Sequence, residues 1–101
     1  MGKEVRLSRK EIEAIREVAK EVFGEGAKVY LFGSRVNPEL KGGDIDLFIE
    51  VPEERTGVEE KLKFLVKLKE RIGEQKVDVV VRKEGSKDFI SLEAKRTGVL
   101  L

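Results

Sequence analysis

The sequence contains no cysteine and no histidine. Without cysteine there is no disulfide framework and no thiolate metal site, and without histidine there are no imidazole ligands and no Ser-His-Asp triads. No apolar run approaches the ~18 residues that a membrane-spanning helix needs, and the N-terminus lacks the apolar segment of a signal peptide. Any chemistry must therefore use carboxylates, hydroxyls, lysine and arginine, and we expect a cytoplasmic protein that does not bind membranes.

The sequence also lacks an excess of charge of one sign. Charged residues make up 41% of its 101 residues, with 21 lysines and arginines against 20 aspartates and glutamates. This balance argues against generic nucleic-acid binding, which usually needs a basic surface. The length predicts one domain over residues 1–101. Asparagine and glutamine occur once each, as Asn37 and Gln75, while lysine and glutamate abound, a composition typical of a thermophile.

Hydrophobic spacing predicts helices that alternate with strands. Ser8-Arg9-Lys10-Glu11 has the pattern of a capping box, and Gly24 marks the end of the helix that follows it. We expect strands over residues 28–32, 44–51 and 76–82, helices over 57–72 and 87–96 with Ser86 as the cap of the last one, and a short strand or docking segment over 99–101.

The same spacing predicts which side chains are buried. In the helix over 57–72 we expect a buried stripe of Val58, Leu62, Leu65, Val66 and Ile72, with Phe64 and Leu68 beside it. In the last helix we expect Phe89, Ile90 and Ala94 to face the core. The predicted fold class is α/β, a small mixed β-sheet with helices packed on one face. By strand parity the open face should carry Tyr30, Phe32, Phe48 and Val80.

Aspartates occupy strand positions where a hydrophobic residue would be ordinary. Asp44 and Asp46 are two residues apart and therefore point to the same side of their strand, while Ile45 and Leu47 point to the other side. Adjacent carboxylates repel each other unless a cation lies between them, and hard oxygen ligands suit Mg²⁺. The alternative is a solvated edge strand whose charges are balanced by basic residues such as Lys76. Lys76 itself precedes a run of valines that Asp78 interrupts.

A glycine-containing turn precedes this aspartate pair. Gly33-Ser34 follows the short strand over 28–32, and its backbone N–H groups and hydroxyl could bind phosphate oxygens. We expect a short helix to begin over 34–39 and the glycines at 42 and 43 to let the backbone approach a ligand closely. An ordinary turn is the alternative interpretation.

Gly33-Ser34, nine residues and then Asp44-x-Asp46 between hydrophobic flanks resembles the signature of the DNA polymerase beta-like nucleotidyltransferase superfamily. The short chain is similar to the minimal nucleotidyltransferase branch, which often pairs with a HEPN-domain protein as a toxin–antitoxin system. The resemblance covers residues 28–82. The loop departs from many relatives, which have ten residues there and commonly end the loop in serine.

The resemblance implies that Asp44, Asp46 and Asp78 are the catalytic, metal-binding carboxylates, with two Mg²⁺ ions expected when nucleotide is bound. It also implies that Gly33 and Ser34 bind the phosphates of ATP, with Arg35 as a possible charge partner. Glu50 is a weaker rival to Asp78, because it shares the face of Asp46 further along the strand.

The activity implied is transfer of a nucleoside monophosphate, AMP from ATP, to a hydroxyl group, with a tyrosine of a HEPN RNase as the acceptor and antitoxin action as the result. Two alternatives stay open. One is a non-catalytic antitoxin that neutralises the HEPN protein by binding it. The other is a small-molecule or RNA-end nucleotidyltransferase that acts with a separate substrate-binding subunit.

Overall fold

The computed structural model describes residues 7–33, 44–52 and 57–101. In chain order its elements are α1 (Arg9–Phe23), β1 (Lys28–Phe32), β2 (Ile45–Val51), α2 (Val58–Ile72), β3 (Val77–Lys83), α3 (Phe89–Thr97) and β4 (Val99–Leu100). The predicted order and type of these elements are confirmed, and their ends agree to within a residue or two. The short helix predicted over 34–39 lies outside the described residues.

The start of α1 is set by the predicted capping box. The Ser8 hydroxyl accepts a hydrogen bond from the Glu11 backbone N–H at 3.1 Å, and the Glu11 carboxylate accepts one from the Ser8 N–H at 2.9 Å. The predicted cap of α3 is wrong. Asp88 is the N-cap of that helix, whereas the Ser86 hydroxyl donates to the Lys83 carbonyl oxygen at 2.7 Å and stabilises the preceding turn.

The described strands form one mixed sheet in the order β3-β2-β1-β4. β2 lies antiparallel to β1 and parallel to β3, and β4 is an antiparallel edge strand on β1. The parallel pairing of β2 with β3 is possible because α2 connects them across one face of the sheet. The small mixed α/β fold is therefore as the sequence predicts.

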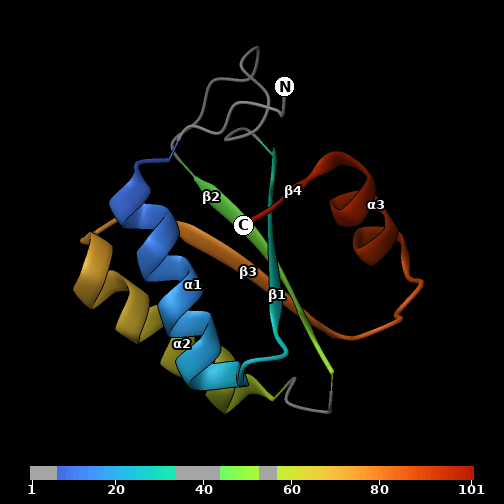
Figure 1. Cartoon of the computed structure of the whole chain (residues 1–101), viewed down its shortest axis with the longest axis horizontal. Helices are drawn as coiled ribbons and strands as arrows, with labels where there is room; N and C mark the ends of the chain where they lie inside the picture. Colours follow the sequence, from blue (N-terminus) through green and yellow to red (C-terminus); the bar gives the residue numbers. More distant parts are fainter. Residues whose placement is uncertain (1–6, 34–43, 53–56) are drawn as a thin grey trace.

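The two longer helices cover the apolar face of the sheet. Figure 1 shows α1 and α2 side by side against the same side of the strands. Buried strand residues of this face include Leu31, Leu47 and Val79. From α2 it is Phe64 and Leu68 that are fully buried, and the Phe64 ring lies 5.8 Å from that of Phe23 in α1.

The prediction of which α2 residues are buried is wrong for three of the five residues of the stripe. Val58, Leu62 and Val66 are exposed, and Leu65 and Ile72 are only partly buried against the core. The helix has apolar residues on two sides, and helical spacing alone cannot say which side meets the sheet. In the fold the side with Phe64 and Leu68 does so.

The opposite face of the sheet is not left open along its whole length. α3 lies over it, so that the sheet is sandwiched between α3 and the pair of α1 and α2 (Figure 1). Phe48 is fully buried there, its ring 6.0 Å from that of Tyr30, and is not the exposed aromatic that strand parity alone predicted. Ala94 of α3 is buried as expected, but Phe89 is 79% exposed, so its predicted core position is wrong.

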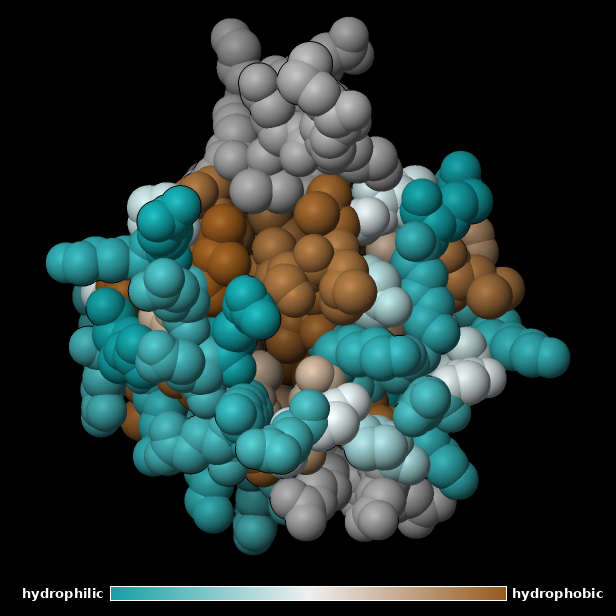
Figure 2. All heavy atoms as spheres, viewed as in Figure 1, coloured by the Kyte–Doolittle hydropathy of each residue, from teal (hydrophilic) through white to brown (hydrophobic). Residues whose placement is uncertain are grey.

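The β4 edge exposes apolar surface. Figure 2 shows hydrophobic residues gathered in the middle of this view, where Figure 1 draws the end of the chain. A groove of about 630 Å³ runs between α1 and this edge, and its lining includes Val29 and Leu100 beside Arg16 and Lys20. Among the described residues, no helix is long and apolar enough to cross a membrane.

Candidate functional site

Two of the predicted carboxylates lie on neighbouring strands at the same level. The parallel register of β2 and β3 places Asp46 opposite Asp78, and the antiparallel register with β1 places Phe32 on the other side of Asp46. Asp78 is exposed and alternates with the buried Val77 and Val79, so its side chain lies on the face away from the main core. Strand pairing therefore brings together aspartates that are 32 positions apart in the numbering.

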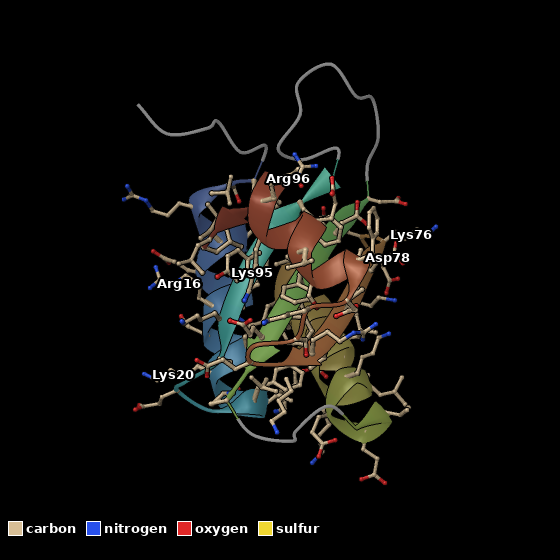
Figure 3. The ribbon with its side chains drawn as sticks, turned by 90° about the vertical axis from the view of Figure 1, so that its right-hand side faces the viewer. Arg16, Lys20, Lys76, Asp78, Lys95 and Arg96 are labelled. Atoms are coloured by element: carbon tan, nitrogen blue, oxygen red, sulfur yellow. The ribbon has the colours of Figure 1, made fainter. Side chains whose placement is uncertain are left out.

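Asp44 lies one residue before β2, at the end of the sheet where β3 begins. The Ile45 N–H donates to the Lys76 carbonyl oxygen at 3.0 Å, which ties the two strand starts together. The Lys76 ammonium lies 3.5 Å from Asp44 Oδ2; the Lys76 side chain is 71% exposed and the Asp44 side chain 46% exposed. Figure 3 shows Lys76 and Asp78 next to each other at this end of the sheet. Lys76 is thus a counter-charge at the site, as one of the two interpretations of the sequence proposed.

The electrostatics of the site centre on Asp46. Partial burial raises the pKa of this carboxyl above its usual value, the negative charges of Asp78 and Asp44 raise it further, and Lys76 opposes them. Each carboxylate is therefore close enough to affect the ionisation of Asp46. A divalent cation would relieve this repulsion, and carboxylate oxygens are the ligands that Mg²⁺ prefers.

The three aspartates do not form a ready metal cage. Within residues 7–33, 44–52 and 57–101, no group of three acidic side chains has a geometry that could hold a metal ion. The repulsion among the carboxylates and the contact between Asp44 and Lys76 both oppose convergence of their oxygens. The residue types fit Mg²⁺, and a Mg²⁺ site of this kind is commonly completed by substrate phosphates and water.

Gly33 is the residue of the phosphate turn that the structure describes. Its backbone has φ +79°, a conformation that favours glycine. A Cβ at this position would lie 3.2 Å from Asp46 Cγ and still closer to Oδ2 of the same carboxylate. The glycine therefore allows Asp46 to pack directly over the end of β1. From the sequence we expected this turn to bind phosphate, and the structure places the Asp46 carboxylate in the space beside Gly33.

Ser34, Arg35 and the rest of the loop up to residue 43 lie outside the described residues, so their predicted contacts with phosphate stay predictions. Glu50 is placed away from the site. It is buried on the α3 side of β2 and forms an ion pair with Lys95 of α3, which makes it a structural residue rather than a rival to Asp78.

Comparison with known proteins is consistent with this geometry. Residues 12–101 match the family described as "Nucleotidyltransferase domain". The fold also matches the crystal structure of a "putative nucleotidyltransferase" from Sulfolobus solfataricus, with a TM-score of 0.50 and 23% sequence identity over 93% of this chain and 87% of that one. No curated protein sequence gives a significant match.

Proposed function

The chain belongs to the nucleotidyltransferase domain family, and from that premise we propose that it transfers AMP from ATP to a hydroxyl group, with Asp44, Asp46 and Asp78 as its metal-binding carboxylates. The observation that carries the proposal is the register that sets Asp46 opposite Asp78, with Asp44 close enough to raise the pKa of Asp46 further. Carboxylates that cluster at one sheet end repel each other, and a metal-binding site for nucleotidyl transfer would account for their position.

Each residue has a distinct task in this proposal. Asp44 and Asp46 would hold Mg²⁺, and Asp78 would complete the site and accept the proton of the attacking hydroxyl. The hydroxyl oxygen forms a bond to the α-phosphorus of ATP while the bond to pyrophosphate breaks, and pyrophosphate leaves. When bound, the metal supplies stabilisation of the charge that develops on the attacking and leaving oxygens. Gly33 lets the chain turn beside Asp46, because a Cβ at this position would meet the Asp46 carboxylate. Ser34 would bind the β- and γ-phosphates, as the family resemblance implies. The partly exposed position of Asp46 leaves room for the substrate.

The acceptor that we propose is a tyrosine hydroxyl of a HEPN-domain RNase, so that addition of AMP silences the toxin. The family resemblance supports this acceptor. The alternative within the same biology is an antitoxin that acts by binding alone.

A double substitution tests the chemistry. Asp44→Asn with Asp46→Asn keeps the size of both side chains and removes the charges that would hold the metal. We expect the protein to stay folded and to lose transfer of α-³²P-labelled AMP from ATP to a co-expressed HEPN protein by at least ~1,000-fold, a loss of about 4 kcal/mol in transition-state stabilisation. Glu13→Gln, which removes one exposed carboxylate from α1, is the control and should transfer AMP normally.

The same variants separate enzyme from binder. If the double variant still protects cells from the HEPN protein as well as the unchanged chain does, antitoxin action is binding and the acceptor proposal fails. If labelled AMP appears on RNA ends or on a small molecule instead, the nucleotidyl transfer stands and the protein acceptor is wrong. Retained transfer by the double variant would refute the assignment of Asp44 and Asp46.

A further inference from the structure

The outer side of α2 carries an apolar stripe whose side chains are exposed to solvent. We define the α2 stripe as Val58, Leu62 and Val66, which are 72%, 55% and 58% exposed. Residues four apart on a helix lie one above the other, so these side chains form a continuous row along two turns. Figure 1 shows α2 along the outer edge of the molecule, with α1 beside it.

The α2 stripe points away from the sheet and from α1, the described elements against which α2 packs. Phe64 and Leu68 face the sheet and are fully buried. The side toward α1 is polar, and there Lys67 donates to Glu21 at 2.8 Å and Arg71 to Glu17 at 3.3 Å. No internal contact among the described residues therefore explains why the third side of this helix is apolar.

Apolar surface also links the α2 stripe to the core. Leu65 and Ile72, on the side between the stripe and the sheet, are partly buried and pack against core residues. A row of exposed aliphatic residues that continues from the core differs from singly scattered ones, and such surfaces usually mark a contact with another molecule.

The charged residues beside the α2 stripe indicate which molecule could cover it. Glu59 and Lys63 lie along one flank and, with Leu62, Val66, Lys67 and Glu70, line a shallow groove of about 540 Å³. When two copies of a helix pack antiparallel about a two-fold axis, the same flank of each copy meets. With the axis near Leu62, Val58 lies opposite Val66 of the second copy. Glu59 is three residues and Lys63 one residue from this axis, so on the shared flank Glu59 lies within about one helical turn of Lys63 of the second copy. The symmetry repeats this charge pair, so the surface is complementary to itself.

We infer that a second copy of this chain covers the α2 stripe, through antiparallel packing of α2 on α2 about a two-fold axis near Leu62. The inference goes beyond the proposed nucleotidyl transfer and does not depend on it, because α2 lies on the face of the sheet opposite Asp46. The contact is confined to one helix face, so we expect a reversible dimer of micromolar affinity rather than an obligate one.

Leu62 is the centre of this contact and gives the first test. Sedimentation equilibrium from low to several hundred micromolar protein should show reversible dimerisation of the unchanged chain, and Leu62→Glu should weaken it at least ~30-fold by placing two carboxylates on the axis. Leu92→Glu is the matched control, because Leu92 lies in α3, is 54% exposed and should leave dimerisation unchanged. A chain that stays monomeric throughout this range overturns the inference.

Charge reversal tests the orientation of the two helices. Glu59→Lys and Lys63→Glu each create repulsion at both copies of the pair, and each should weaken self-association about tenfold. The antiparallel arrangement further predicts that an equimolar mixture of the two variants forms a heterodimer as tight as the original dimer. In that heterodimer the first variant has lysine at both positions and the second has glutamate at both, so both contacts are attractive.

The mixture thus separates this geometry from other dimers. Self-association that neither charge reversal changes, or a mixture that does not restore the dimer, refutes the antiparallel α2 contact. A different protein that binds the α2 stripe and is displaced by Leu62→Glu, while the chain alone stays monomeric, also overturns it. Circular dichroism of every variant at a concentration where the chain is monomeric shows whether the fold is kept.

Discussion

Two acidic residues on the same face of β2 have opposite surroundings. Asp46 and Glu50 are four residues apart, about 13 Å along an extended strand, and both point away from the main core. Glu50 is 4% exposed and is paired with Lys95 of α3. Asp46 lies partly open at the strand start, faces other carboxylates and has a raised pKa. Figure 3 shows Lys95 on α3, in front of the sheet, and Asp78 at its upper end.

The two carboxylates differ in how the fold balances their negative charge. The buried carboxylate receives a counter-charge from within the chain, because an unpaired ion in the core would cost several kcal/mol. At Asp46 the counter-charge is incomplete, since Lys76 approaches Asp44 and acts on Asp46 only at longer range. The site thus keeps an excess of negative charge that an external cation can balance.

The largest effect on stability is expected at the Glu50 end of this comparison. Lys95→Met should lower the free energy of unfolding by about 3 kcal/mol, because it leaves Glu50 buried without a partner. Changing both residues, as Glu50→Met with Lys95→Met, should recover most of this loss. Urea unfolding of the original chain, the single variant and the double variant measures these differences in the free energy of unfolding. A single variant as stable as the original would mean that the pair contributes nothing and that the contrast with Asp46 is only apparent.

A smaller loss of stability is expected from substitution of Gly33, whose backbone lies against the Asp46 side chain. Gly33→Ala should cost about 2 kcal/mol, part from its positive φ and part from displacement of Asp46. Gly73→Ala is a matched control, because Gly73 has φ +87° and nothing within 4 Å of the added carbon. It should cost only the backbone part, about 1 kcal/mol. Equal losses in thermal or urea unfolding would show that Asp46 does not press on Gly33.

The smallest effect has the opposite sign. Asp46→Asn should raise the free energy of unfolding by less than about 1 kcal/mol at neutral pH, because it removes repulsion from Asp78 and Asp44 at a partly exposed position. The pKa of Asp46 is raised in the folded state, so the folded chain binds this proton more readily than the unfolded chain does. The penalty that ionised Asp46 imposes is therefore relieved as pH falls through its folded pKa.

Chemical unfolding of the original chain and of Asp46→Asn at several pH values measures this effect. The two stabilities should converge as pH falls toward the usual pKa of aspartate, 3.8, because a protonated Asp46 resembles asparagine. An Asp46→Asn variant that is less stable at neutral pH would mean that Asp46 makes a favourable contact in the apo protein, and the electrostatic contrast with Glu50 would be lost.

Much of the fold could be predicted because its signals are local. The capping box at Ser8 acts within one turn, and alternation along β2 fixes which side chains share a face. What failed was the choice among faces. Val58 and Leu62 have the spacing of a buried stripe, as do Phe64 and Leu68, and only the docking of α2 on the sheet decides between them.

For the candidate site, the sequence by itself determined the residue types and the side on which the aspartates point, because strand parity is a property of the backbone. Only the tertiary structure decided that Asp78 lies opposite Asp46, that α3 covers Phe48 and Glu50, and that Asp46 fills the space beside Gly33. These depend on register and on helix docking, which join segments distant in the chain. Strand register and helix docking are stabilised by burial and by charge pairing between distant segments, and the spacing of residues within one element does not reveal these contacts.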